Sequence, residues 1–219
     1  MKKIGVLLSG CGHRDGSEVH EATIALLAID EAGYEAHCFS PRGPQMTVRD
    51  HVTGDEMDEK RDMMVEAARI ARGKIRDIIA VQAKDIDALI IPGGTGAALN
   101  LSSYFADGTN CTVHPEVERL IVELIDAKKP IGGICIAPAM IAKVLQNKGI
   151  NATLTLGGKG DLLDSLKGMG QTPKECLAID CVIDTKNKIV STPAYVNANS
   201  IGDLHSGISK LVDAVAAMI

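Results

Sequence analysis

Aromatic residues are scarce in this chain of 219 residues, which contains two Phe, three Tyr and no Trp. The hydrophobic core must therefore be built from Ile, Leu, Val, Ala and Met. Basic residues are not in excess either, because 23 Lys and Arg stand against 28 Asp and Glu and the net charge is -5. With no basic stripe and no aromatic residues between basic ones, nucleic acid is not expected as a partner.

Long hydrophobic runs are also missing. A membrane-spanning helix needs about 20 apolar residues, and no run in this sequence approaches that length. We therefore expect no membrane partner. The first residues, "MKKIGVLLSGCG", hold too few apolar residues in a row for a secretory signal and are typical of a first strand instead.

The cysteines show no C-x-x-C spacing, so neither a zinc ribbon nor a disulfide framework is indicated. A reducing, cytoplasmic compartment fits this usage, and no metal or cofactor is predicted. The six are Cys11, Cys38, Cys111, Cys135, Cys176 and Cys181.

Short apolar runs alternate with segments of helical period, which predicts one α/β domain over residues 1–219 with a mainly parallel sheet. The expected strands are 3–10, 34–40, 86–94, 130–136 and 151–157, with a β-hairpin over 176–193. The expected helices are 17–33, with Ser17 as its cap, 63–72, 114–129, 137–149 and 198–219. Residues 97–112 are expected to form a loop.

The stretch "GGICIAPA" places Cys135 between a predicted strand and a predicted helix. Ligands of parallel sheets bind at such strand ends. A helix N-terminus would stabilise a thiolate and lower its pKa, and the following N–H groups would bind an oxyanion. The alternative is a cysteine that only fills the core, because free cysteines are among the most buried residues.

A second strand end, "IIPGGTG", contains Gly93 and Gly94. Their N–H groups would form an oxyanion hole together with the N–H groups that follow Cys135. Pro-Gly-Gly alone signals only a turn. On the first predicted helix, Glu18 and Glu21 lie three residues apart on one face, and either would serve as the proton acceptor or donor for the thiol. Solvated carboxylates that stabilise a helix start are the structural alternative.

The glycine-rich stretch "SGCGHRDGSE" (9–18) precedes a helix but lacks the G-x-G-x-x-G and Walker patterns. We expect it to line the pocket rather than to bind phosphate. Cys11 and His13 alone do not make a metal site.

Several motifs together resemble one family along essentially the whole chain. They are "IGVLLSGCG", "DGSEVHEA", "IIPGGTGAALNLS", "CTVHPEVE", "GGICIAPAM" and "STPAYV". They resemble the ElbB family, glyoxalase-like bacterial proteins once linked to enhanced lycopene (isoprenoid) biosynthesis. That family is part of the ThiJ/PfpI superfamily, which has a class I glutamine amidotransferase-like fold.

The resemblance implies a flavodoxin-like three-layer α/β/α sandwich, commonly a homodimer, with Cys135 as the nucleophile at an elbow. It places the superfamily's thiol-binding glutamate on Glu21 or Glu18, with Glu21 favoured by its distance from the end of the helix. The oxyanion turn falls on Gly93 and Gly94, with the amide of Ile136 as partner.

Two departures from the family pattern bear on the reaction. Many members carry His directly after the nucleophile, where this chain has Ile136. Glutamine amidotransferases need a His well after the cysteine, and His205, inside the last predicted helix, is the only one here, so amidotransfer is disfavoured. His20, His13 or a water molecule would have to replace the missing histidine.

Together with these residues, the resemblance implies a cofactor-independent glyoxalase-type enzyme that converts glyoxal to glycolate through a Cys135 hemithioacetal, with an apparent deglycase activity by the same chemistry. The alternative is a redox-responsive or partner-binding protein with an oxidisable cysteine and little turnover, linked to regulation of isoprenoid biosynthesis. Peptide or amide hydrolysis is a third reading, but it needs a general acid for the leaving group, and the sequence offers no obvious one.

Overall fold

A seven-stranded sheet forms the centre of the protein, whose computed structural model describes all residues 1–219. The strands lie in the order β3-β2-β1-β4-β5-β9-β8, and only β8 is antiparallel to its neighbour. They are β1 (Lys3–Leu7), β2 (Glu35–Ser40), β3 (Ile75–Asp77), β4 (Ala88–Ile91), β5 (Ile131–Ile134), β8 (Val182–Asp184) and β9 (Ile189–Thr192).

The central strands are buried on both faces, so their residues alternate between two hydrophobic clusters. In β4, Ala88 and Ile90 join the cluster on one face, while Leu89 and Ile91 join the cluster on the other. All four side chains are completely buried. Helices must therefore cover both faces of the sheet.

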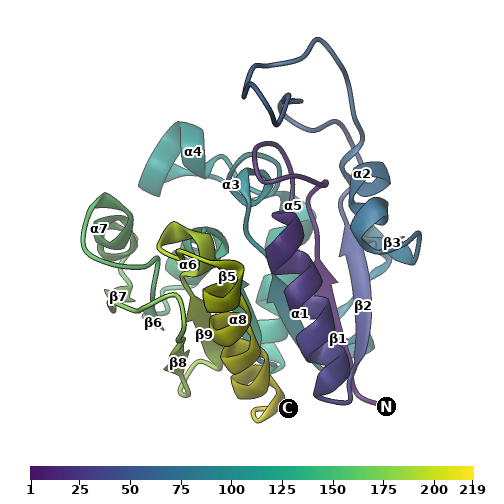
Figure 1. Ribbon diagram of the computed structural model, residues 1–219. Coiled ribbons are helices and arrows are strands. Elements are labelled where there is room, and N and C mark those ends of the chain that lie inside the picture. The colour runs from purple at the N-terminus through teal and green to yellow at the C-terminus, as the bar shows by residue number, and fades with distance from the viewer.

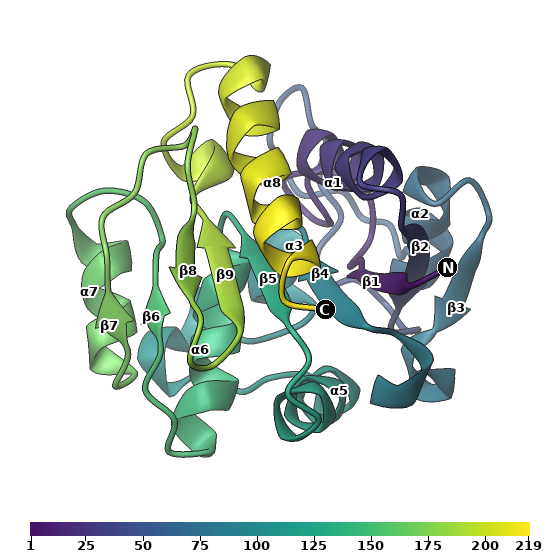
Figure 2. The ribbon, with the colours of Figure 1, turned by 90° about the horizontal axis from the view of Figure 1, so that it is seen from below.

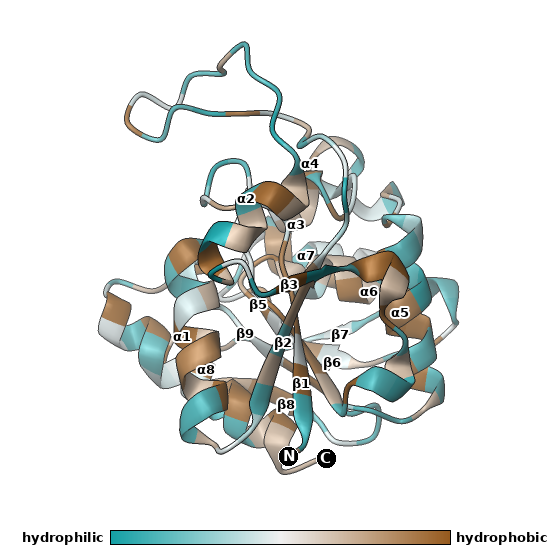
Figure 3. Ribbon diagram, turned by 90° about the vertical axis from the view of Figure 1, so that its right-hand side faces the viewer, coloured by the Kyte–Doolittle hydropathy of each residue, from teal (hydrophilic) through white to brown (hydrophobic).

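Helices occupy the two outer layers, as Figure 2 shows. One face is covered by α1 (Val19–Glu31), α2 (Met63–Ile70) and α8 (Ile201–Ala216). The other is covered by α3 (Thr95–Leu99), α4 (Tyr104–Asp107), α5 (Pro115–Asp126), α6 (Ala137–Asn147) and α7 (Asp161–Gly168). The helices carry hydrophobic and hydrophilic bands along their length (Figure 3). This is the predicted flavodoxin-like α/β/α sandwich, and the prediction is confirmed.

The predicted hairpin is also confirmed, since β8 and β9 pair in antiparallel fashion. The predicted cap of α1 is wrong. Glu18 holds that position, and its Oε2 accepts a hydrogen bond from the N–H of Glu21 at 2.7 Å. Ser17 instead accepts a hydrogen bond from the N–H of Ser9 at 2.9 Å, which ties the loop before α1 to the end of β1.

Two other segments differ from their predictions. Within 151–157 only Thr153–Leu154 (β6) is a strand, and it pairs with Thr172–Pro173 (β7) outside the main sheet. The N–H groups of Thr153 and Thr155 bind the side chains of Asp184 and Ser191 rather than a strand backbone. The predicted loop 97–112 contains most of α3 and all of α4, because Ala97 and Ala98 of α3 and Tyr104 of α4 pack on the core.

Residues 41–62, between β2 and α2, extend away from the body of the protein (Figure 1). A bridge between Pro44 and Asp62 holds the base of this segment. Val52, in the middle of the segment, is 92% exposed. All six cysteines are free. No helix combines the length and the hydrophobicity that a membrane-spanning helix requires.

Candidate active site

Cys135 lies in the sharp turn between β5 and α6, with a φ of +59°. Its N–H donates to the carbonyl of Thr192 on β9 at 2.9 Å. The preceding glycines permit close packing, because a Cβ on Gly132 would lie 2.8 Å from Leu211 and one on Gly133 would lie 2.8 Å from Ile141. The strained turn thus presents the thiol at the carboxyl end of the sheet.

Glu21 connects Cys135 to two other strand ends. Its carboxyl group is fully buried, and Oε2 accepts a hydrogen bond from the N–H of Gly93 at 2.9 Å. Oε1 accepts a hydrogen bond from the N–H of Tyr195 at 3.3 Å. The carboxyl group also lies against the Cys135 thiol and is one of the causes that raise its pKa. Of the two candidate glutamates, Glu21 is therefore the one in contact with the thiol.

Glu18 has a different position. Its carboxylate caps α1 by accepting a hydrogen bond from the N–H of Glu21. The same side chain lines the pocket above Cys135. The negative charge of Glu18 is one of the causes that raise the pKa of Glu21. Glu18 thus influences the pair through Glu21.

Gly93 and Gly94 are glycines for different reasons. A Cβ on Gly93 would lie 2.5 Å from the Cβ of Cys135 and 2.8 Å from Oε2 of Glu21. Gly94 has a φ of +90°, which disfavours other residues, and its N–H contacts the Cys135 sulfur, as does the N–H of Ile136. Since the N–H of Gly93 is bonded to Glu21, the Gly94 and Ile136 amides are the donors that face the sulfur.

The electrostatics of the pair differ from the sequence-based expectation. Burial, then the nearby Glu18 charge, raises the pKa of Glu21 to about 8. Burial, then the Glu21 carboxyl, raises the pKa of Cys135 well above its ordinary value, and the Gly94 and Ile136 amides oppose this shift without cancelling it. The expected lowering by the helix N-terminus is outweighed by desolvation. At pH 7 both groups are therefore mainly neutral.

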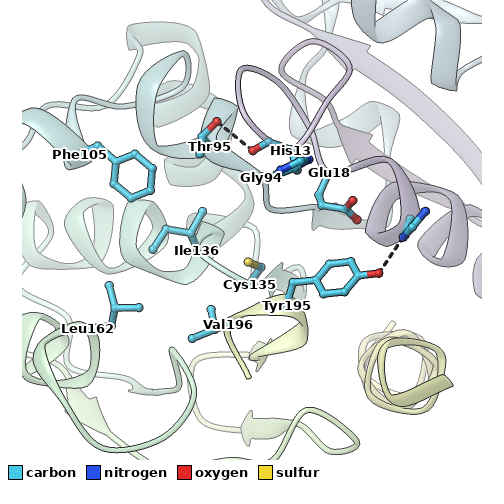
Figure 4. A pocket seen from close by; sticks show the side chains of 11 residues that line it. His13, Glu18, Gly94, Thr95, Phe105, Cys135, Ile136, Leu162, Tyr195 and Val196 are labelled. Atoms are coloured by element: carbon cyan, nitrogen blue, oxygen red, sulfur yellow. Dashed lines mark hydrogen bonds between the residues drawn. The ribbon is translucent and has the colours of Figure 1, made fainter. Parts of the chain in front are cut away.

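Cys135 opens onto a pocket of about 650 Å³. Phe105, Ile136, Leu162 and Val196 lie on one side of the thiol, and Glu18 and Tyr195 lie on the other (Figure 4). The remaining residues that line it are His13, His20, Gly94 and Thr95.

Two histidines, His13 and His20, line the pocket. Nδ1 of His20 lies 2.7 Å from the hydroxyl of Tyr195, which fixes the orientation of the ring. The pKa of His13 is lowered, first by burial and then by the neighbouring His51 and Arg14. His205 on α8 is exposed and is not among the lining residues.

The glycine-rich loop 9–18 lines the pocket, as predicted, through His13 and Glu18. It is joined to the turn after β4 by three backbone hydrogen bonds. The N–H of Glu18 donates to Gly93, that of Gly96 donates to Gly16, and that of Thr95 donates to His13, all at 2.9 Å. The Thr95 hydroxyl also donates to the His13 carbonyl at 3.0 Å (Figure 4).

The sequence did not identify several pocket residues. The sequence offered Tyr195 only as part of the family motif "STPAYV". Its position just after β9, the strand next to β5, is the signal that would place it near Cys135. Phe105 and Leu162 come from segments with no helix prediction and no chemical motif. Their role depends on tertiary packing.

Comparison with known proteins identifies relatives along nearly the whole chain. The chain is 42% identical over 223 residues to the "ES1 protein homolog, mitochondrial" of Rattus norvegicus, covering 97% of this chain and 82% of that protein. It is 41% identical over 220 residues to the human "Glutamine amidotransferase-like class 1 domain-containing protein 3, mitochondrial", covering 96% and 81%. No family model matches.

Solved structures show the same fold. An isoprenoid biosynthesis protein with an amidotransferase-like domain from Ehrlichia chaffeensis superimposes with a TM-score of 0.91 at 34% identity, covering 99% of this chain and 100% of that one. A DJ-1 superfamily protein from Agrobacterium tumefaciens has a TM-score of 0.56 at 18% identity, covering 99% and 88%.

Proposed function

Because the chain belongs to the ES1 and class I glutamine amidotransferase-like family of the DJ-1/ThiJ/PfpI superfamily, we propose that it is a cofactor-independent glyoxalase that converts glyoxal to glycolate. The observation that carries the proposal is the buried Glu21 carboxyl that lies beside the Cys135 thiol beneath the pocket. A carboxyl group with a pKa of about 8 can both accept and return a proton near neutral pH.

The reaction begins with addition of the thiol to one aldehyde. The ionised fraction of Glu21, about a tenth at pH 7, takes the thiol proton as Sγ bonds to C1. The resulting oxyanion of the hemithioacetal accepts hydrogen bonds from the Gly94 and Ile136 amides. Glu21 thus produces the nucleophile only when an electrophile is present.

An internal redox step follows. Glu21 first returns the thiol proton to the oxyanion, and its carboxylate then removes the C1 proton, which gives an enediol. Protonation of C2 by Glu21 gives a thioester of glycolic acid on Cys135. C1 is oxidised while C2 is reduced, so no external oxidant is consumed. Water then cleaves the thioester, which releases glycolate and restores the thiol.

His20 is the group that we assign to the acid–base steps on the solvent side. It lines the pocket, and the Tyr195 hydroxyl holds its ring at 2.7 Å. This places an imidazole in the site although residue 136 is isoleucine. Activation of the water that cleaves the thioester is the step that an imidazole suits best.

Glyoxal turnover by the wild type, Cys135→Ala and Cys176→Ala tests this proposal. Cys176 is also free and partly exposed but lies outside the pocket, so its variant controls for the loss of a thiol. We expect glycolate formation to be lost only in Cys135→Ala. Equal rates in all three proteins would exclude Cys135 as the nucleophile.

The redox-responsive alternative is less well supported. Selectively oxidised cysteines are low-pKa thiols, whereas the surroundings of Cys135 raise its pKa. Titration with peroxide followed by intact-mass analysis separates the two, and the glyoxalase proposal expects no selective oxidation of Cys135 at doses that leave the other cysteines intact. Amidotransfer is not proposed, because no histidine after Cys135 lines the pocket.

A further inference from the structure

The pocket is larger than glyoxal requires. Glyoxal has four heavy atoms and occupies on the order of 100 Å³, judged from the about 30 Å³ that one liquid water molecule takes. The pocket encloses about 650 Å³, which lies in the range of sites that bind much larger molecules. Most of its volume therefore has no role in the reaction proposed above.

The unused volume has an apolar wall on one side of the thiol. Phe105 comes from α4, Ile136 from the turn before α6, Leu162 from α7, and Val196 from the turn after β9. Figure 4 shows these four side chains on the same side of Cys135. Phe105 is 50% exposed, so water covers a large aromatic surface when the pocket holds no apolar group.

The other side of the thiol is polar. There the His20 and Tyr195 pair stands beside Glu18. The two oxyanion donors, the Gly94 and Ile136 amides, lie at the sulfur between the two sides. A molecule that fits this arrangement has an apolar part, a carbonyl at its centre and a polar leaving group.

We propose that Cys135 also hydrolyses esters or thioesters of apolar acyl groups. The acyl chain lies on Phe105, Leu162 and Val196, the carbonyl oxygen accepts hydrogen bonds from Gly94 and Ile136, and the leaving group faces His20. This inference rests on the nucleophile and the thioester hydrolysis of the proposed glyoxalase reaction, but on none of its enediol steps.

The added step is an acyl transfer. Sγ bonds to the carbonyl carbon while Glu21 takes the thiol proton, and the bond to the leaving oxygen or sulfur breaks as Glu21 returns that proton to the leaving atom. The acyl group is left as a thioester on Cys135. Water cleaves this thioester to a carboxylic acid, so the site performs the final step that glyoxal conversion also needs.

A chain-length series of p-nitrophenyl esters from acetate to octanoate tests the inference. Because burial of one methylene changes an equilibrium constant about fourfold, kcat/KM should rise about fourfold for each methylene until the wall is covered. Intact-mass analysis should show one acyl group added to the wild type and none to Cys135→Ser. Cys135→Ser should also lose the hydrolysis above background.

Two matched variants test the wall itself. Phe105→Ala should lower the octanoate-to-acetate ratio of kcat/KM several-fold, whereas Ile183→Ala, on β8 and 48% exposed, should leave it unchanged. Equal ratios in these variants, or a Cys135-dependent rate that does not change with chain length, would overturn the inference and leave the glyoxalase proposal intact. A rising series without glyoxal turnover would support the inference and overturn the glyoxalase proposal.

Discussion

Replacing Glu21 with glutamine should change how the stability of the protein depends on pH. The folded protein raises the pKa of this carboxyl from 4.5 to about 8. The group therefore contributes its full stability below the unfolded pKa, and this contribution is lost as pH rises toward 8. Each pH unit in that window costs about 1.4 kcal/mol, so the wild type should lose about 2.5 kcal/mol between pH 5 and pH 7 that Glu21→Gln does not lose.

Glutamine also has a cost that does not depend on pH. Glu21 accepts hydrogen bonds from both Gly93 and Tyr195, and an amide has only one acceptor oxygen. One buried N–H is left without a partner, which costs about 1–3 kcal/mol. The informative quantity is thus the change of the difference in unfolding free energy with pH, not its value at one pH.

Urea unfolding from pH 5 to pH 8, followed by far-UV circular dichroism because the chain has no Trp, measures this quantity. Glu31→Gln removes one exposed carboxylate from the same helix and serves as the control. A difference between wild type and Glu21→Gln that stays constant over this range would refute the reasoning, since Glu21 would then be ionised in the folded protein at neutral pH.

Three further predictions concern the same site. Iodoacetamide labelling of Cys135 should rise with pH through a midpoint that lies above that of a free thiol. Glu21→Gln should lower this midpoint pH because the carboxyl raises the pKa of the thiol, and an unchanged midpoint would contradict this coupling. Gly93→Ala should destabilise the protein by about 1–3 kcal/mol and reduce glyoxal turnover at least tenfold, because its Cβ would displace Cys135 or Glu21. Thermal unfolding measures the first effect and a glycolate assay the second. Turnover equal to that of the wild type would refute the close approach of Gly93 to Cys135 and Glu21. Tyr195→Phe keeps the backbone bond to Glu21 but releases His20, so kcat should fall about tenfold with little change in KM, and a pure KM effect would argue against His20 as an acid–base group.

The sequence was sufficient for the fold and for the position of Cys135 because both depend on local signals. Alternating apolar runs and helical periods located every strand of the main sheet except β3, and the Gly-Gly-Ile-Cys stretch located the elbow. Spacing within α1 reduced the partner of the thiol to Glu18 or Glu21. The structure then separates them, because one faces Cys135 while the other caps the helix.

What the sequence could not show depends on burial and on long-range contacts. A helix start after Cys135 predicts a lowered pKa, but the direction is set by how completely the thiol and Glu21 are desolvated. The pairing of His20 with Tyr195 joins residues 175 positions apart in the chain. The apolar wall is likewise formed by segments that meet only in the folded protein.

The main-chain groups around the thiol have a consequence for how such sequences diverge. Gly93 and Tyr195 hold Glu21 through their N–H groups, and the sulfur is contacted by the N–H groups of Gly94 and Ile136. Any residue other than proline supplies an amide, so the side chain at position 136 can change from histidine to isoleucine without loss of a hydrogen-bond donor. A substitution there changes the lining of the pocket while the amide beside the sulfur stays in place. Relatives of this chain are therefore better recognised by their glycines and backbone turns than by a fixed set of polar side chains.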